Sequence, residues 1–426
     1  MNHKKLICAV LTALLFWNGR TVPVRAEQAE APGAETRAEL SAEPEKAGEE
    51  SQAEPSAGEG ASASMDWFEE KGLTLGESSV AYPAIREGCL TEVLREKVNE
   101  RILEDGNIRE YVTRVSQLIS GGRMNVAWRG TVLGPVFSFE ITAEGAVTTP
   151  RPDHVRTGGN IDLRDGHEIA PEEILKDPDA AMEMMESYLE EEIAPELSAH
   201  LQNSQVTPLP ERFRMTERGL IWMYSRDQLS TLSDRAGDLL VPWEAIQDQL
   251  DLSEGGILSE MGIARRFAAD GLPDGASERI REMTDSGRIP GVPAALGGSM
   301  QELTDAWGML TDPDVYVHGR MFALEGADFQ GVFLQTDFLS ESWEQSAVDG
   351  IRIDLGGAEG LAVGQTRREA WIQALGEPEH SIEMDEETAE AYRTVPGTRD
   401  YYAFGKHRLQ LQADQEGVLR SIVLSE

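Results

Sequence analysis

Residues 124–142, MNVAWRGTVLGPVFSFEIT, decide the fold class of this chain. Their β-branched and aromatic side chains predict two successive strands, Met124–Val132 and Pro135–Thr142. Two helices are expected before them, Glu92–Leu103, where apolar residues recur at helical spacing, and Ile108–Ile119. Helices followed by a run of strands are typical of an α+β fold and differ from a parallel βαβ series. We therefore predict an α+β domain here.

Further elements of the same kind are expected as far as residue 252. In chain order they are a strand and tight Asp-Gly turn over Asn160–His167, an acidic helical stretch over Pro171–Leu201, hairpin strands Phe213–Thr216 and Gly219–Tyr224, a strand Asp238–Trp243 and a helix Glu244–Leu250. Turn residues and alternating apolar positions mark the strands. The mixture predicts one α+β domain over residues 65–252.

Several of these motifs stand in the order found in a known envelope domain. They are Tyr82-Pro83 before the Leu90–Ile102 helix, Asn160-Ile161-Asp162-Leu163 with Pro171–Leu175 behind it, and Phe213–Ile221 closed by Leu240–Trp243. On these motifs, about Trp67–Leu252 resembles the RsiV-type domain, which forms the extracellular half of lysozyme-sensing anti-sigma factors and accompanies some peptidoglycan deacetylases. The resemblance implies a ligand-sensing envelope domain. The Gly-Gly-Ala-His-Gly turn of many members is replaced by about Glu144–Val147, so its histidine contact is not carried over.

The first 26 residues are expected to be a cleaved signal peptide. Met1–Lys5 is basic, Leu6–Trp17 is an apolar run, and a polar stretch then ends at the small residue Ala26. The run has twelve residues, whereas a helix needs about 20 to span a bilayer, so an uncleaved membrane anchor is the weaker alternative. Bulky Ile7 before Cys8 disfavours a lipid anchor. With only five residues before the run, a transmembrane anti-sigma factor is not expected.

Residues 27–64 consist almost wholly of Ala, Glu, Gly, Ser and Pro. Such a composition offers little apolar surface to offset ordering entropy, so we predict a disordered acidic spacer. It would either carry the folded part away from a cell wall or be a tolerated tail. The whole chain has a formal net charge of −38, which disfavours nucleic acid and anionic lipid and favours basic partners or cations. After cleavage only Cys89 remains, either as a buried thiol or as an intermolecular contact, and the oligomeric state stays open.

The C-terminal region contains an internal duplication. Tyr316-Val317-His318-Gly319 matches Tyr402-Ala403-Phe404-Gly405, 86 residues further on, and Ala-Asp and Gly-Val pairs follow each copy at equal offsets. After a linker over 253–276, we therefore predict two tandem modules, 277–345 and 346–426, each a helix followed by antiparallel strands.

The module helices and strands have local signals of their own. Capping boxes predict the helix starts, and glycines in the left-handed conformation are expected to close the helices. The boxes are Ser299-x-x-Glu302 and Thr366-x-x-Glu369, and the closing glycines are Gly308 and Gly376. The expected strand pairs are Arg320–Glu325 with Gly331–Thr336, and His407–Gln412 with Val418–Leu424.

Two motifs in this region resemble known small modules. Gly364–Glu369 with Leu375–Pro378 resembles the α+β modules of the β-lactamase-inhibitor and outer-membrane-assembly lipoprotein type. Gly287–Gly291 resembles the start of an uncharacterised secreted domain of Gram-positive bacteria built from such modules in tandem. The resemblance covers about 277–426 and implies a protein-binding sheet face. The interaction residues it suggests are Tyr316, His318, Tyr402, Phe404 and His407, each with ordinary core or strand packing as the alternative.

No motif in the sequence supports catalysis. The histidines do not fall at helical i, i+4 spacing, and serine elbows, Ser-x-x-Lys pairs and phosphate-binding loops are missing. We therefore assign no catalytic, metal or cofactor residues and predict a secreted, non-catalytic envelope protein that binds an extracellular or cell-wall partner, such as lysozyme. The alternatives are an inhibitor or scaffold of a wall-associated enzyme, and a cell-wall glycan-acting enzyme whose carboxylates converge in one cleft.

Overall fold

The computed structural model describes residues 65–117, 122–146, 153–197, 201–231, 237–267, 271–338 and 342–426. The predicted signal peptide and spacer lie outside these ranges. Within them the chain combines helices with largely antiparallel sheets, so the α+β class is confirmed.

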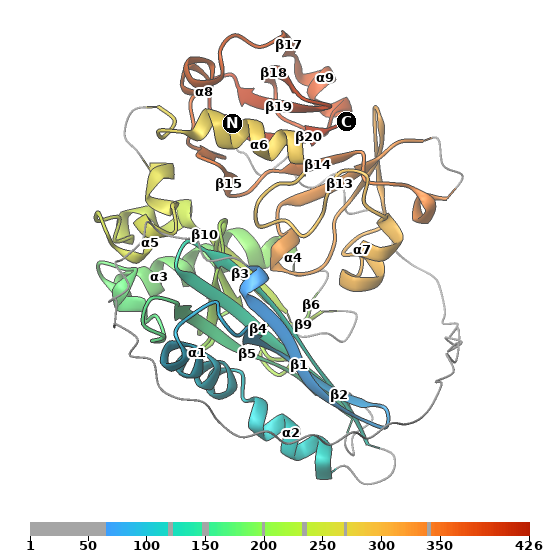
Figure 1. Ribbon diagram of the computed structural model, residues 1–426. Coiled ribbons are helices and arrows are strands. Elements are labelled where there is room, and N and C mark those ends of the chain that lie inside the picture. The colour runs from blue at the N-terminus through green and yellow to red at the C-terminus, as the bar shows by residue number, and fades with distance from the viewer. Residues whose placement is uncertain are drawn as a thin grey trace, which may run out of the picture. The chain divides into compact units, whose positions relative to one another are not determined.

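The first sheet has five strands in the order β1-β2-β3-β4-β5. They are β1 Phe68–Leu75, β2 Ser78–Ile85, β3 Arg123–Leu133, β4 Val136–Ala146 and β5 Asp153–Asp162. All neighbours are antiparallel except β2 and β3, which make a short parallel contact. Helices α1 Glu92–Asp105 and α2 Ile108–Gln117 pack on this sheet around buried Phe137 and Phe139 (Figure 1).

The strands over 124–142 are confirmed, with two differences. The second begins at Val136, one residue late, because Pro135 has no N–H to give to the ladder. It then runs on to Ala146, so most of the segment expected as a turn near 144–147 is strand. The β1–β2 hairpin was not predicted, because β1 is exposed at most positions and shows no apolar alternation.

The acidic stretch 171–201 is not one helix. It consists of a 3₁₀ turn Pro171–Glu173, α3 Pro178–Tyr188, a π turn Leu189–Ile193 and α4 Ala194–Leu197, while Leu201 begins the strand β6 Leu201–Ser204. Pro178 causes the main break because it disfavours helical backbone at the preceding residue. Asp177 instead caps α3, accepting a hydrogen bond from the Ala180 N–H at 3.1 Å.

The predicted hairpin and closing strand form a small buried sheet. It contains β7 Phe213–Met215, β8 Gly219–Met223 and β10 Asp238–Pro242 in the order β10-β8-β7, and a separate pair joins β6 to β9 Leu229–Thr231. The helix expected over 244–250 is instead a 3₁₀ segment, Trp243–Gln249, interrupted at Ile246. Trp243 is fully buried and donates its indole N–H to the Thr216 carbonyl at 3.0 Å, which fixes this segment against the hairpin. Two short helical turns follow, α5 Ile257–Glu260 and a 3₁₀ turn Ile263–Phe267.

The C-terminal region forms one eight-stranded antiparallel sheet in the order β11-β12-β13-β14-β20-β19-β18-β17. Its strands are β11 Asp314–Tyr316, β12 Gly319–Phe322, β13 Val332–Thr336, β14 Gly350–Ile353, β17 His380–Met384, β18 Gly397–Phe404, β19 His407–Asp414 and β20 Leu419–Ser425. The helices here are α6 Ala276–Ser286, α7 Met300–Trp307, α8 Arg368–Leu375 and α9 Glu386–Ala391, and the short turns are η7 Ala327–Phe329, η8 Trp343–Gln345 and the hairpin β15 Gly357–Ala358 with β16 Leu361–Ala362. Helices α6, α7 and α8 contribute to one core with the sheet.

Both predicted strand pairs are present, and the two predicted modules share this single sheet. Arg320 pairs with Thr336, and Leu409 pairs with Leu424. The matched tyrosine motifs are not equivalent in space, however. The first hairpin turns between Tyr316 and Gly319, whereas the second turns two residues later, at Gly405.

The predicted helix ends are partly corrected. The Ser299 hydroxyl accepts from the Glu302 N–H at 3.3 Å, as expected of a cap. Thr366 does not cap α8, because its hydroxyl accepts from the Ala362 N–H at 2.8 Å and the helix begins after Arg367. The closing glycines, Gly308 and Gly376, have positive φ angles of 82° and 89°, but their ψ angles are extended, so they are not in the left-handed helical conformation.

Candidate functional site

The five residues suggested from the sequence lie in two separate places. His318 is exposed on the β11–β12 hairpin, 3.1 Å from the Tyr392 hydroxyl, and the half-buried Tyr316 ring packs edge-on against it. Phe404 is half-buried beneath the Arg281 guanidinium, which lies 4.5 Å from the ring centre.

Tyr402 and His407 are buried, which favours the alternative of ordinary core packing for these two residues. The Tyr402 hydroxyl donates to the carbonyl of Gly376 at 3.1 Å, and Nδ1 of His407 lies 2.8 Å from the carbonyl of Thr284. Both side chains therefore point toward the helices and hold α8 and α6 on the sheet. Positions matched in sequence therefore differ in exposure.

An open groove of about 440 Å³ lies beside helix α6, and we call it the α6 groove. Its lining residues are Arg279, Glu282, Met283, Ser286, Arg288, Ile289, Pro290, Gly291, Val292 and Glu359. The first four recur every three or four residues, so they share one face of α6. Gly287 then ends the helix at a φ of 68°, and the chain turns back so that buried Ile289 and Val292 form an apolar floor with Met283.

Glu359 reaches the groove from a strained turn. It stands with Gly360 between Ala358 and Leu361 of the β15–β16 hairpin, at a φ of 51°. Left-handed backbone is uncommon for a residue other than Gly, Asn or Asp, and such positions cluster at functional sites. The Glu359 carboxylate accepts from Nε of Arg279 at 2.9 Å, which ties the turn to α6.

A second carboxylate residue, Glu217, lies next to Gly291 of the groove lining. Its Cβ is 3.8 Å from the position that a Cβ on Gly291 would take, and the backbone N–H of Glu359 donates to it. Burial, and then the charge of Glu359, raise the pKa of Glu217 to about 7, although Arg266 and Arg279 oppose the rise. Burial also raises the pKa of Glu359 above its ordinary value. At neutral pH Glu217 is therefore only partly ionised.

Buried arginines fix the backbone around Glu217. Arg218, 1% exposed, donates to the carbonyls of Asp328 at 2.9 Å and of Leu355 at 3.2 Å. Arg266 donates to the carbonyl of Glu217 itself and to the carboxylate of Glu244. The backbone at Glu217 is thus held by Arg218, which bonds to the carbonyls of residues 328 and 355, and by Arg266, which bonds to the Glu217 carbonyl.

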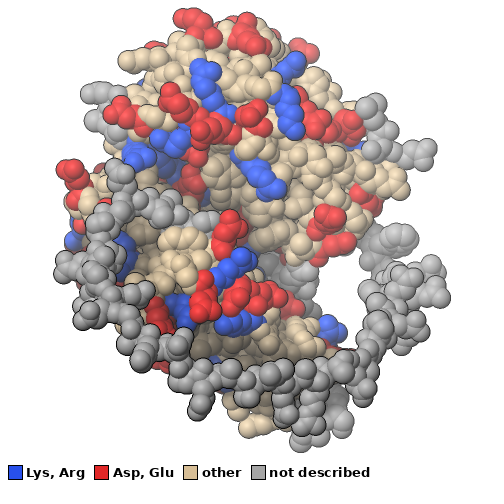
Figure 2. Space-filling view, in the orientation of Figure 1, with Lys and Arg blue, Asp and Glu red and all other residues tan. Residues whose placement is uncertain are grey.

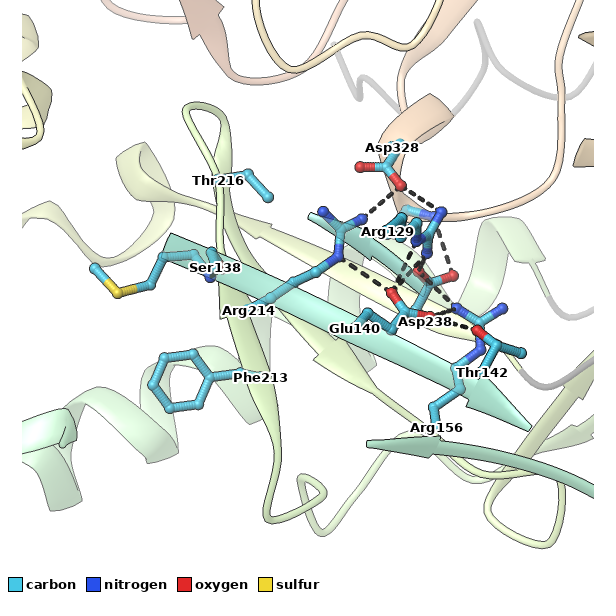
Figure 3. A network of polar contacts seen from close by, with 12 residues as sticks. Arg129, Ser138, Glu140, Thr142, Arg156, Phe213, Arg214, Thr216, Asp238 and Asp328 are labelled. Atoms are coloured by element: carbon cyan, nitrogen blue, oxygen red, sulfur yellow. Dashed lines mark hydrogen bonds and ion pairs between the residues drawn. The ribbon is translucent and has the colours of Figure 1, made fainter. Parts of the chain in front are cut away.

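A network of three arginines and three carboxylates lies at the junction between the small sheet and η7 (Figure 3). Its members are Arg129, Glu140, Arg156, Arg214, Asp238 and Asp328. Arg129 lies 2.8 Å from Glu140, 2.6 Å from Asp238 and 2.7 Å from Asp328. Arg156 lies 2.7 Å from Glu140 and 3.0 Å from Asp238, and Arg214 pairs with both Glu140 and Asp328.

This buried charge network is balanced in charge. Burial alone would raise the pKa of Glu140, but Arg129, Arg156 and Arg214 together hold it well below its usual range. Because each carboxylate already has arginine partners, the network suits a structural junction better than a site for a metal or cofactor. Across the described ranges, no cluster of three or more His, Cys, Asp or Glu is placed to hold a metal ion, and no helix is long and apolar enough to cross a membrane.

No family model and no curated protein matches the chain. Among solved structures, a DUF3298-family protein from Bacteroides fragilis is similar at 10% identity, with 47% of this chain and 98% of that chain covered and a TM-score of 0.34. A DUF3298-family protein from Pseudomonas aeruginosa is similar at 10% identity, covering 43% of this chain and 94% of its own, with a TM-score of 0.31. The DUF4309-family protein YjgB from Bacillus subtilis is similar at 11% identity, covering 35% and 95%, with a TM-score of 0.23. These families are domains of unknown function.

Proposed function

We propose that the protein is a non-catalytic binding protein of the extracytoplasmic side, and that the α6 groove receives a lysine or arginine side chain of a basic partner. The observation that carries this proposal is the Glu359 carboxylate in the lining of a groove with an apolar floor, with Glu217 next to the lining residue Gly291. Lysine and arginine have an apolar stem and a charged head. The stem would lie on Met283, Ile289 and Val292, and the head would meet the carboxylates.

Charge on the whole molecule favours the same partner. Acidic side chains are spread over the face drawn in Figure 2, with Lys and Arg among them, and the chain carries a formal net charge of −38. Such a field speeds encounter with basic proteins and makes it sensitive to salt. The predicted signal peptide supports a place outside the cytoplasm, and the resemblance of 67–252 to lysozyme-sensing domains makes lysozyme the first partner to try.

The test is calorimetric titration of the purified protein with lysozyme at low and moderate salt. Saturable binding that weakens about tenfold in E359Q supports the proposal. The matched control is E96Q, which removes one exposed acidic charge from α1, outside the groove, and should bind as the wild type does. Equal binding by both variants would move the site away from the groove. Complete loss of lysozyme activity on addition of one equivalent of the protein would show that binding is also inhibitory.

One specific observation favours a second candidate, a glycan hydrolase. A carboxyl with a pKa of about 7 beside a second carboxylate is the arrangement of a general acid and its ionised partner. Against it, Glu359 is held by Arg279 in an ion pair. Release of reducing ends from peptidoglycan, lost in both E217Q and E359Q, would favour the hydrolase over the binding protein.

A further inference from the structure

Two buried arginines lie on the face of the eight-stranded sheet that points away from α6 and α8. On β14, Arg352 alternates with Ile351 and Ile353, which belong to the core. On β18, Arg399 precedes Asp400, whose carboxylate accepts from the indole N–H of Trp371 on α8. Because successive side chains of a strand point to opposite faces, both arginines lie on the face opposite that core.

Arg399 differs from the arginines of the buried charge network, each of which has carboxylate partners, and resembles Arg218, which donates only to carbonyls. It is 4% exposed, and its hydrogen-bond acceptors are neutral, Oε1 of Gln412 at 3.0 Å and Oε1 of Gln410 at 3.5 Å. The Tyr392 ring centre lies 5.0 Å from its guanidinium carbon. Within the part of the chain that the structure describes, no carboxylate is within ion-pair distance of Arg399. Arg352 is 5% exposed but has Asp354 at 2.7 Å.

A buried guanidinium without a counter-ion is unusual in a folded protein. Arginine keeps its charge under all physiological conditions, and buried charges are normally paired. Burial, and then the charge of Arg352, lower the pKa of Arg399, so the two arginines repel one another. Asp354 neutralises Arg352 but does not lie within ion-pair distance of Arg399. An anion supplied from outside would complete the pair.

Aromatic side chains surround the two arginines. The Tyr392 ring packs on Arg399, and the backbone carbonyl of Tyr392 accepts from Nη1 of Arg352 at 3.3 Å. His380 stacks on Tyr401, with ring centres 4.2 Å apart. Burial, and then the charge of Asp349, raise the pKa of Tyr316 to about 12, and both arginines oppose this rise, which places Tyr316 near them. Tyr392 follows α9 directly, and the next residue, Arg393, has a φ of 53°. The Tyr392 ring thus lies on a tight turn next to Arg399.

We propose that Arg399, next to Arg352, forms a binding site for a carboxylate group of a peptide, on the sheet face opposite α6 and separate from the α6 groove. The planar guanidinium fork matches a carboxylate in two parallel hydrogen bonds. The surrounding tyrosines offer flat apolar surface to the peptide. The negative field of the chain disfavours polyanions, so a single carboxylate fits better than a nucleic acid or an anionic membrane.

The experiment uses the whole protein and the probe acetyl-Ala-Ala-Ala with a free C-terminal carboxylate. Its amidated form and a peptide with an internal glutamate and an amidated end separate the two sources of carboxylate. We expect the free-carboxylate peptide or the glutamate peptide to bind and R399Q to weaken that binding at least tenfold. The matched control is R408Q. It removes an exposed arginine of β19 that lies on the same sheet face as Arg399, and it should change affinity less than twofold.

A second measurement on the wild type keeps the test independent of folding in R399Q. Arginine modification by phenylglyoxal, mapped by mass spectrometry, should be slowed at Arg399 and Arg352 by the binding peptide and unchanged at Arg408. Equal binding of the fully neutral amidated peptide, undiminished binding by R399Q, or absence of protection at Arg399 would each overturn the proposal. Saturation by inorganic phosphate without competition from either peptide would overturn it as well. None of these outcomes bears on lysozyme binding at the α6 groove.

Discussion

Arg214 of β7 and Asp328 of η7 are 114 residues apart in sequence, yet they form a buried ion pair. The same carboxylate also lies 2.7 Å from Nη1 of Arg129 on β3. Residues from the predicted domain 65–252 and from the predicted module 277–345 therefore share one network. The α6 groove depends on this junction, because Glu217 precedes Arg218, whose guanidinium holds the Asp328 carbonyl.

Asp328→Asn should destabilise the protein strongly. It leaves the Arg129 and Arg214 guanidiniums facing a neutral group, and removing one partner of a buried pair typically costs about 3–5 kcal/mol. The free energy of unfolding from urea titration measures the loss.

The matched control for this change is Glu100→Gln. Glu100 pairs with Arg109 on the surface, where an ion pair contributes little. We expect no measurable change from the control. If D328N were as stable as E100Q, the network would not join the two regions.

Stability should fall as pH rises from about 4.5 to about 7. The folded-state pKa of Glu217 is about 7, above its ordinary value of 4.5, so between these values the unfolded state binds fewer protons than the folded state. The carboxyl of Asp105, whose pKa burial raises to about 6, contributes in the same direction up to that pH. Above pH 7 both contributions are constant. Thermal midpoints measured from pH 4.5 to 8 give the curve.

Glu217→Gln should remove the upper part of this slope, between pH 6 and 7, and leave the part due to Asp105. Asp105→Asn should reduce the slope only below about pH 6 and leave the part due to Glu217, which spans the whole window. A wild-type midpoint that rises with pH across the window, or an E217Q curve that overlays the wild type, would show that Glu217 titrates normally.

Glu359→Asn tests the role of the left-handed turn separately from the role of the Glu359 carboxylate. Asparagine tolerates the left-handed backbone better than glutamate, so the hairpin should be kept and stability should change by about 1 kcal/mol or less. The carboxylate is lost, so binding of a lysine-containing peptide should weaken about tenfold. Circular dichroism melting and calorimetry measure the two effects. Large unfolding without a specific binding loss would make Glu359 a structural residue only.

Local patterns predicted most elements of the fold, because helical spacing and strand composition act over a few residues. The helix at Glu92, the strands after Met124 and the module hairpins were found in this way. The sequence could not show that β1 is a strand, because its exposed residues carry no alternation. It also could not show that the second hairpin turns two residues later than the first, or that Tyr402 is buried.

The candidate sites depended on contacts that no local pattern carries. Glu217 and Glu359 come from distant hairpins, and their raised pKa values arise only when burial brings them together. The Glu359-Gly360 pair, a turn dipeptide between short apolar runs, was the one available signal for this hairpin. Arg399 has no sequence signal at all, since its lack of an acidic partner appears only in three dimensions.

The most direct test of the binding account is calorimetric titration of the protein with a lysine-containing peptide at pH 6 and pH 8. If the lysine head meets Glu217, binding requires that carboxyl to ionise, so affinity should rise roughly tenfold between the two pH values and protons should be released at pH 6. E217Q should lose both the rise and the proton release. Binding that is equally strong at both pH values, in wild type and E217Q alike, would contradict the assignment of the α6 groove as the site for a cationic side chain.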